Sequence, residues 1–486
     1  MLFNSFEFLL LFLPIVFFLY FYLNKKRLTI ASKSVLVASS LVFYSWWNIL
    51  YLPLILSSIL VNYVVGSLLS NNLEKIILPR KSILFFGIAF NLLLLGYFKY
   101  SDFLIENINI VFDANLSLLY LTLPLAISFF TFQQIAYLVD SYKGNTNEHD
   151  FLNYIVFVTF FPQLIAGPIV HHKEMMPQFS CLKNKVINHK NIILGIFIFS
   201  IGLFKKVVIA DTFSVWASVG FDVNQQLHLI EAWFTSLSYT FQLYFDFSGY
   251  TDMAVGLALL FNIRLPINFN SPYKSKNIQD FWRRWHITLS RFLRDYLYIP
   301  LGGSKVSNFK VYNNLMITFL VGGIWHGAGW TFIFWGFLHG IALIIHRIWA
   351  YSGIKISNFL AWFITFNFIN ISWVFFRAKE WEDAIKVIKG MLGLSGVMLP
   401  NKFRELLQIS DRYEIMFGDI YINFYGNSEI LMWIILAFCL VLFFKNSNQL
   451  MSQFKMNNRM TIFIAFILSI GLMNISKTSE FLYFNF

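Results

Sequence analysis

The sequence predicts an all-helical protein that crosses a membrane many times, and its composition and long apolar runs are the two observations that predict it. Of its 486 residues, 57% are hydrophobic, 20% are aromatic and only 13% are charged. Soluble domains carry about 25% charged residues, so this chain has too few charges to cover several water-soluble domains. Because one spanning helix needs about 20 apolar residues, the chain has room for about 11–13 transmembrane or re-entrant helices.

The apolar runs follow one another along the chain as a single membrane-embedded unit, residues 1–486. In order, they lie near 6–23, 34–50, 52–70, 82–98, 117–139, 151–170, 191–210, 229–262, 311–350, 357–377, 430–444 and 460–475. The run at 229–262 fits one long helix or two short ones, and the run at 311–350 fits two. Several runs are interrupted by Pro, Gly or polar residues, which membranes tolerate only where protein or a water-filled cavity covers the backbone. The interruptions therefore predict an internal cavity.

The net charge of +12 is assigned to membrane orientation and not to nucleic-acid binding, because basic residues of multispanning proteins concentrate in cytoplasmic loops. Basic residues follow the first and third runs, whereas 99–116 carries three acidic residues and one lysine. Residues 264–310 hold nine Lys or Arg against two Asp. This bias predicts a multi-pass protein of the cytoplasmic membrane with an extracytoplasmic N-terminus and a cytoplasmic segment 264–310. The first run, without a basic n-region or a small-residue cleavage site, is expected to be a retained span and not a signal peptide.

The two cysteines, Cys181 and Cys439, lie far apart and predict neither a disulfide framework nor a metal site. Motifs of metalloproteases, P-loop NTPases, serine hydrolases and dinucleotide-binding proteins are absent from the sequence.

Residues 277–299 predict a basic amphipathic helix. Aromatic and aliphatic side chains recur at helical spacing on one side, and Asn277 is expected to cap the start. Two i,i+4 ion pairs are expected, Asp280–Arg284 and Arg291–Asp295. Such a helix typically lies in the membrane interface. The alternative is a phosphate-rich ligand held by the arginines. These are Arg283, Arg284, Arg291 and Arg294.

His326 stands in an apolar, glycine-rich run at 321–340. An ionisable residue inside the membrane is costly and faces the helix bundle or a cavity, so it is a candidate functional residue. Imidazole takes a proton near neutral pH, as a general base must. The alternative is a neutral histidine that hydrogen-bonds between helices. His339, on the same run, is predicted to pack inside the protein. His286 is predicted either to orient a substrate or to anchor the chain at the membrane interface.

Asp246 and Asp252 lie in apolar surroundings within 244–256. Paired acids in a membrane relay protons or bind cations, but they also cap broken helices or pair with arginines such as Arg283 or Arg284. Structural pairing is the favoured interpretation. His171 and His172 are expected to be ordinary loop histidines.

These blocks, taken together, resemble the membrane-bound O-acyltransferase family, in its bacterial branch of alginate O-acetylation and peptidoglycan-acetylating proteins. The resemblance is carried in order by PQLIAGPI (162–169), YFDFSGYTDMAVG (244–256), NFNSPY (268–273), FWRRWHITLSRFLRDYLYIPLGG (281–303), GGIWHGAGWTFIFWGFLHG (322–340), NISWVFFRAKEWEDAIKVIKGMLG (370–393) and FLYFNF (481–486). It implies N-terminal helices at 1–140, a catalytic core at 141–350, and C-terminal helices at 351–486 with an inserted loop at 389–428. It also implies a ring of helices around a central tunnel, where donor and acceptor meet from opposite faces.

The resemblance implies an enzyme that moves acetyl from cytoplasmic acetyl-CoA toward an extracytoplasmic polysaccharide. His326 matches the family's invariant histidine, as general base or acyl acceptor, and His286 matches a second functional histidine. The arginines would bind donor phosphates or lipid headgroups. A separate SGNH-type acetyltransferase partner and no bound cofactor are expected. Two alternatives stay open: transfer of D-alanyl or another acyl group from a carrier-protein thioester to teichoic acid, and a transporter or flippase without bond chemistry.

Overall fold

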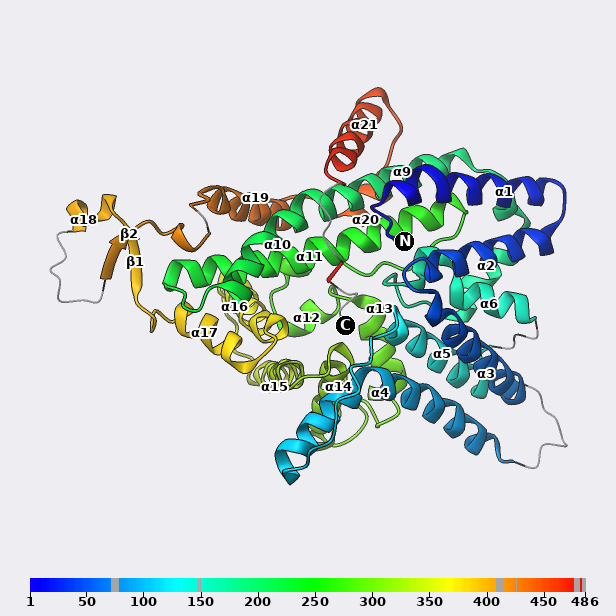
Figure 1. Cartoon of the computed structure of the whole chain (residues 1–486), viewed down its shortest axis with the longest axis horizontal. Coiled ribbons are helices and arrows are strands. Elements are labelled where there is room, and N and C mark those ends of the chain that lie inside the picture. Colours follow the sequence, from blue (N-terminus) through cyan, green and yellow to red (C-terminus); the bar gives the residue numbers. More distant parts are fainter. Residues whose placement is uncertain are drawn as a thin grey trace.

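The computed structural model describes residues 1–486 except 71–77, 147, 149, 408–414, 425, 476–480 and 483–486, and the fold is almost entirely helical (Figure 1). The N-terminal α-helices are α1 (Leu13–Lys25), α2 (Thr29–Ser45), α3 (Leu52–Ser70), α4 (Arg80–Phe112), α5 (Ile127–Tyr142), α6 (Phe151–Thr159), α7 (Phe161–Leu164) and α8 (His172–Ser180). The central ones are α9 (His189–Phe204), α10 (Asp211–Ser218), α11 (Leu229–Leu260), α12 (Ile278–Trp282), α13 (Ile287–Leu293), α14 (Asn308–His326) and α15 (Trp330–Ser352). The C-terminal ones are α16 (Asn358–Arg377), α17 (Trp381–Met391), α18 (Lys402–Leu407), α19 (Glu429–Phe443), α20 (Ser447–Ser452) and α21 (Asn458–Met473).

Short π- and 3-10-helical turns extend or link these helices. The π-helical ones are η1 (Glu7–Phe12), η4 (Lys205–Ala210), η5 (Val219–Val223) and η7 (Arg294–Tyr298), and the 3-10 ones are η2 (Ile49–Tyr51), η3 (Leu182–Lys185), η6 (Pro272–Lys274) and η8 (Ile422–Phe424). Within 389–428, β1 (Val397–Pro400) pairs in parallel with β2 (Ile415–Gly418). The segment 389–428, predicted to be an inserted loop, thus contains a small sheet. Its residues 408–414 and 425 lie outside the described residues.

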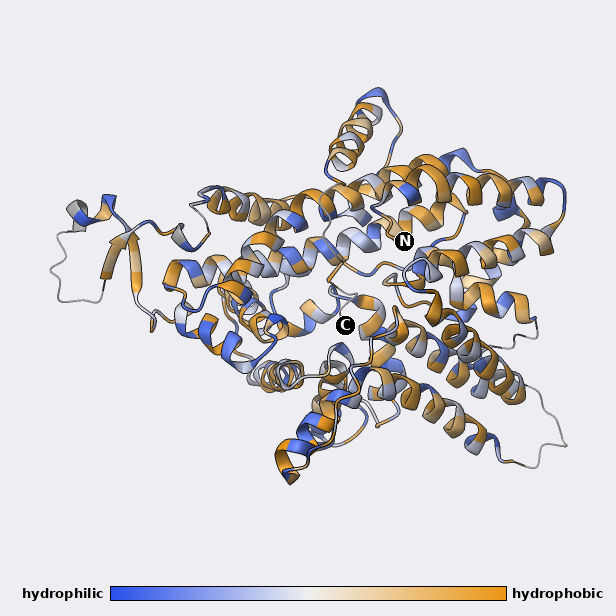
Figure 2. Ribbon diagram, in the orientation of Figure 1, coloured by the Kyte–Doolittle hydropathy of each residue, from blue (hydrophilic) through white to orange (hydrophobic). Residues whose placement is uncertain are grey.

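Six helical stretches among the described residues are long and apolar enough to cross a membrane, in agreement with the predicted fold class. They are Glu7–Lys25, Ile49–Ser70, Arg80–Phe112, His189–Val223, Trp330–Ser352 and Asn358–Arg377. Three shorter apolar helices are α2, α19 and α21. Figure 2 shows hydrophobic residues along most helices and hydrophilic residues gathered in loops and at helix ends. The run at 229–262 forms one helix, α11, and the run at 311–350 forms two. The number of spans stays a prediction.

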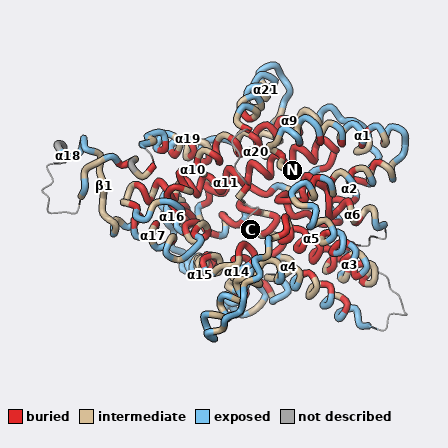
Figure 3. The backbone as a smooth tube through the Cα atoms, in the orientation of Figure 1, coloured by how far each residue is buried: buried red, intermediate tan, exposed pale blue. Residues whose placement is uncertain are grey.

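The core lies along α11 and the two helices that pack against it, α9 and α10, which follow one another in line with η4 between them (Figures 1 and 3). Nearly every residue of α11 is buried. The α9 and α11 backbones approach closely because glycines face one another across the contact. A Cβ built on Gly202 would lie 2.5 Å from the Gly249 carbonyl oxygen and 2.6 Å from the Met253 nitrogen. The glycines of the YFDFSGYTDMAVG motif are therefore helix-packing residues.

We expect Gly202→Ala to destabilise the protein by about 1–3 kcal/mol, because overpacking forces the two backbones apart. Gly96→Ala is the matched control, since a Cβ on this α4 glycine meets nothing within 4 Å. Thermal unfolding in detergent measures both, and an unchanged Tm for Gly202→Ala would contradict the packing argument.

Residues 277–299 do not form the single helix that the sequence predicts. Asn277 caps α12 as expected, with its side chain accepting from the Asp280 N–H. The helix then stops, and His286 takes a left-handed conformation at φ +42° before α13 begins. Two backbone hydrogen bonds hold this break to the loop at 268–270: Asn270 N–H to Arg284 O at 2.9 Å, and Ile287 N–H to Asn268 O at 3.0 Å. Tertiary hydrogen bonds thus override the local helical periodicity.

Candidate functional site

His326 is the last residue of α14, and its side chain is buried among aromatic rings. The residue is 3% exposed. Its ring meets Trp325, Trp335 and Phe376 at centroid distances of 4.8, 5.1 and 5.1 Å, all edge-on. The helix ends here because the backbone of the next residue, Gly327, is extended and not helical. The aromatic rings shield the imidazole from water.

Two side chains of α4 hold the carbonyl groups at the end of α14. The Lys99 amine donates to the Trp325 and His326 carbonyl oxygens at 2.5 and 3.1 Å. The Tyr100 hydroxyl donates to the Ile324 carbonyl oxygen at 2.6 Å. The last carbonyls of a helix lack intrahelical donors, and a cationic side chain is favourable there. Lys99 therefore fixes the backbone that carries His326. The sequence analysis missed it because the contact joins residues more than 220 positions apart.

The rings of His286 and His326 both contact the same tryptophan, Trp325. The centroid of the Trp325 ring is 6.3 Å from that of His286 and 4.8 Å from that of His326. His286 is completely buried; its Nδ1 lies 3.1 Å from Asn268 Oδ1. The two histidines named by the resemblance, 40 positions apart in sequence, are thus neighbours in the fold. An interfacial position for His286 is excluded by this burial.

His339 packs inside the fold, as predicted. Its Nδ1 accepts from the Trp282 indole at 3.2 Å, and its Nε2 lies 3.1 Å from the Ser372 hydroxyl. Both ring nitrogens are thus used in contacts between helices.

Two of the four predicted arginines line one cavity, and the other two do not. Arg291 and Arg294 border an open pocket of about 410 Å³, the charged cavity. It is lined by Asp140, Lys143, Asn145, His171, Lys173, Glu174, Arg291, Arg294, Asp295 and Tyr296. Arg284 instead pairs with Asp280 at 2.8 Å, as predicted, and Arg283 does not line this space. The expected Arg291–Asp295 pair is replaced by Arg291–Glu174 at 2.6 Å and Arg294–Asp295 at 2.7 Å. The break at His286 turns the two halves of the segment in different directions.

His171 belongs to the charged cavity and is not an ordinary loop histidine. It is 5% exposed. Arg291 Nε donates to its Nε2 at 3.2 Å, which leaves the proton of a neutral imidazole on Nδ1. Nδ1 lies 3.0 Å from the Tyr296 hydroxyl and 3.5 Å from the Asp140 carboxylate. Burial and the neighbouring Asp140 raise the pKa of the Tyr296 hydroxyl above its ordinary value, so it stays protonated.

A row of aromatic rings in contact with one another, which we call the aromatic wall, extends from the charged cavity to His286 and His326. Tyr296 contacts Phe292 at 5.0 Å, and Phe292 stacks on Phe132 at 4.2 Å. Phe132 stacks in turn on Trp325 at 5.0 Å, and Trp325 contacts both histidines. The rings come from α5, α13, η7 and α14, so only the tertiary structure brings them into line.

Asp246 and Asp252 both form ion pairs, and their partners are lysines. Lys206 lies 2.7 Å from Asp246 and 2.8 Å from Asp211, and Lys205 lies 2.7 Å from Asp252. The predicted pairing with Arg283 or Arg284 is wrong, because the lysines of η4 pack against α11 and the arginines do not. Buried charges need such partners to offset their desolvation.

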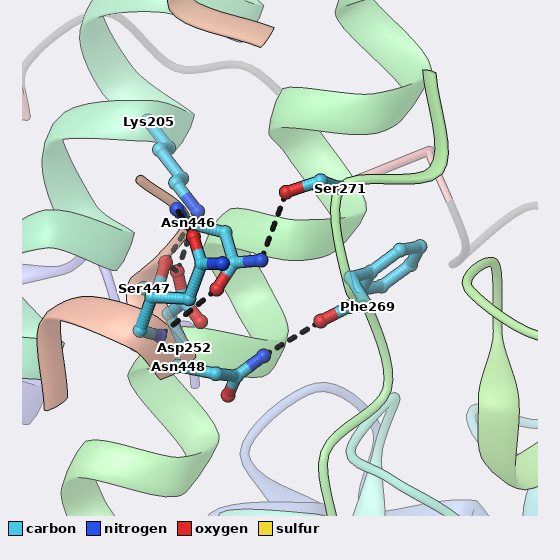
Figure 4. A network of polar contacts seen from close by, with 8 residues as sticks. Lys205, Asp252, Phe269, Ser271, Asn446, Ser447 and Asn448 are labelled. Carbon is cyan, nitrogen blue, oxygen red and sulfur yellow. Dashed lines mark hydrogen bonds and ion pairs between the residues drawn. The ribbon is translucent and has the colours of Figure 1, made fainter. Parts of the chain in front are cut away.

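The Asp252 pair is extended by the start of α20 (Figure 4). The Ser447 hydroxyl donates to the Asp252 carboxylate and accepts from the Lys205 amine at 2.7 Å. Asn446 donates to the Ser271 hydroxyl at 2.8 Å, and Asn448 donates to the Phe269 carbonyl at 2.6 Å. Residues 446–448, the α20 clamp, therefore fasten the loop at 268–271 to the core. The sequence does not predict a role for these residues, because its only signal there is a helix-capping pattern.

The chain is similar in sequence to known acyltransferases. Residues 141–377 match the family model of the membrane-bound O-acyltransferases. A peptidoglycan O-acetyltransferase of Helicobacter pylori is 51% identical over all of this chain and 98% of its own length. A probable alginate O-acetylase of Pseudomonas aeruginosa is 40% identical over 80% of this chain and 75% of its own.

A more distant relative is a teichoic acid D-alanyltransferase of Bacillus subtilis, 26% identical over 53% of this chain and 69% of its own. Since these relatives are named as acyltransferases, they argue against the second alternative, a transporter without bond chemistry. The chain belongs to the membrane-bound O-acyltransferase family and is an O-acyltransferase.

Proposed function

We propose that this protein moves an acetyl group from cytoplasmic acetyl-CoA through the membrane toward peptidoglycan or a related cell-surface glycan. The single observation that supports this most is the joint placement of His286 and His326 on Trp325, at the end of an aromatic wall that leads from the charged cavity. Such a site excludes water, which would otherwise hydrolyse a reactive acyl group.

In the proposed reaction, His326 acts as general base. Its imidazole takes the proton of an acceptor hydroxyl while the oxygen attacks the thioester carbonyl carbon. The tetrahedral oxyanion then collapses, the carbon–sulfur bond breaks, and the proton passes to the departing CoA thiolate. His286 positions the donor beside it or shares in the proton transfer. Direct attack by His326, which gives an acyl-histidine, is a second route to the same products.

The donor nucleotide is proposed to bind in the charged cavity. Four cationic side chains border it, Lys143, Lys173, Arg291 and Arg294, and arginine forms bidentate hydrogen bonds with phosphate. The proposal puts this cavity at the cytoplasmic face, in line with the predicted extracytoplasmic N-terminus. An extracytoplasmic SGNH-type partner would then pass the acetyl group to the glycan.

We expect Arg291→Ala to raise KM for acetyl-CoA about tenfold with a small change in kcat, because a charged hydrogen bond contributes about 1.5–3 kcal/mol. Arg283→Ala is the matched control, since Arg283 is outside the charged cavity. Equal effects from both substitutions would contradict this donor site.

The proposed function is tested by release of CoA from acetyl-CoA by the purified protein in proteoliposomes, with the candidate partner added. We expect release by wild type and none by His326→Ala. If acetyl-CoA is not consumed while a D-alanyl carrier-protein thioester is, the donor assignment is wrong and the D-alanyl alternative replaces it.

A further inference from the structure

Asn268 lies in the loop between α11 and α12, and its side chain contacts the ring of His286. Its side-chain oxygen Oδ1 is 3.1 Å from His286 Nδ1. The same oxygen lies 3.2 Å from the backbone nitrogen of Thr288 and 3.0 Å from the Thr288 hydroxyl. Asn268 is 1% exposed. Three groups thus converge on one buried carboxamide oxygen.

These contacts determine which nitrogen of His286 carries a proton. The Thr288 backbone N–H can only donate, so the carboxamide atom that faces it is the oxygen and not the nitrogen. A carboxamide oxygen can only accept, so His286 Nδ1 must donate. In a neutral imidazole the lone pair is then on Nε2, at the opposite side of the ring. Asn268 therefore selects the tautomer of His286.

The position of Asn268 is itself fixed by the α20 clamp. Asn448 binds the carbonyl group of Phe269, the next residue, and Asn446 binds the Ser271 hydroxyl (Figure 4). The clamp is tied through Ser447 to the Lys205–Asp252 ion pair. The loop also donates and accepts backbone bonds on either side of His286. A continuous polar network thus connects the buried ion pair of the core with the ring of His286.

We propose that Asn268 is the positioning residue of His286: it holds the ring with the proton on Nδ1 and the lone pair on Nε2, and the α20 clamp keeps Asn268 in place. The catalytic meaning of this contact rests on the proposed function, but the tautomer does not. Asn268 acts through His286 and is not itself a catalytic residue.

The first test is spectroscopic and needs no turnover. Nitrogen-15 NMR of the histidine-labelled protein in lipid distinguishes the two neutral tautomers, and the His286 signal is identified by its loss in His286→Gln. We expect the Nδ1-protonated form in wild type and in Asn268→Asp, which keeps an acceptor oxygen. Asn268→Leu should shift His286 toward the Nε2-protonated form. An Nε2-protonated wild type, or an unchanged signal in Asn268→Leu, would overturn the proposal.

Asn448→Ala provides a second variant if Asn268→Leu does not accumulate in the membrane. It removes the bond to the Phe269 carbonyl without contacting His286, and we expect a mixture of the two tautomers. The matched control is Asn62→Leu, which removes another buried carboxamide whose partner is Asn91. This control should lower Tm and leave the His286 signal unchanged; a change there would overturn the assignment to Asn268.

The second test is kinetic, with acetyl-CoA as the donor. We expect Asn268→Leu to lower kcat about 10²-fold with KM nearly unchanged, because a misplaced catalytic group costs about this much. Asn268→Asp should recover most of the rate. An unchanged kcat in Asn268→Leu would overturn the positioning role. If wild type itself consumes no acetyl-CoA, the proposed function fails, whereas the NMR result still decides the role of Asn268.

Discussion

His326→Ala should abolish acetylation of the cell-surface glycan, with a loss of about 10²–10⁴-fold in acetyl transfer, the usual contribution of a general base. The imidazole stands at the end of α14, enclosed by the rings of Trp325, Trp335 and Phe376. Alanine offers no group that takes the acceptor proton, and the buried aromatic surroundings provide no water to replace it. The ester content of purified peptidoglycan from cells with only the variant protein measures the effect.

The control for this experiment is His346→Ala. His346 lies on α15, partly exposed, in an apolar groove apart from His326. It should leave acetylation at the wild-type level. The amount of each variant in the membrane fraction is measured in parallel, so that loss of protein is separated from loss of chemistry. Normal acetylation by a stably inserted His326→Ala protein would contradict the assigned role.

Lys206→Met should destabilise the protein by about 3–5 kcal/mol, the usual cost of removing one partner of a buried ion pair. The Lys206 amine lies between Asp246 and Asp211, and all three side chains are at most 6% exposed. Without the amine, two carboxylates remain close together in the core. Thermal unfolding in detergent and the yield of membrane-inserted protein measure the loss.

A triple variant separates the ion pairs from the packing of the lysine stem. Lys206→Met combined with Asp246→Asn and Asp211→Asn removes all three charges, and we expect most of the lost stability to return. Lys379→Met is the surface control, because Lys379 is 72% exposed and such pairs contribute little. A Lys206→Met protein with the Tm of wild type would show that the ion pairs of Lys206 do not stabilise the fold.

The fold class could be predicted from the sequence, and the two histidines could be named from it as candidates, whereas the arrangement around them could not. An ionisable residue in a long apolar run made His326 a candidate, but a neutral histidine that hydrogen-bonds between helices fits the same pattern. The arginines show the limit of the same reasoning. Helical spacing placed Arg284, Arg291 and Arg294 on one side, and the ligand interpretation added Arg283. The left-handed turn at His286 instead separates Arg283 and Arg284 from Arg291 and Arg294.

The sequence by itself determined that this chain is a helical membrane protein, because hydrophobicity is a sum over residues and needs no knowledge of their neighbours. It also determined the family, through motifs whose order is written along the chain. Only the tertiary structure decided that Lys99 holds the end of α14, that lysines neutralise Asp246 and Asp252, and that Asn268 faces His286. Each of these contacts joins distant segments, and a hydrogen bond or ion pair forms only when packing brings its two atoms within about 3 Å.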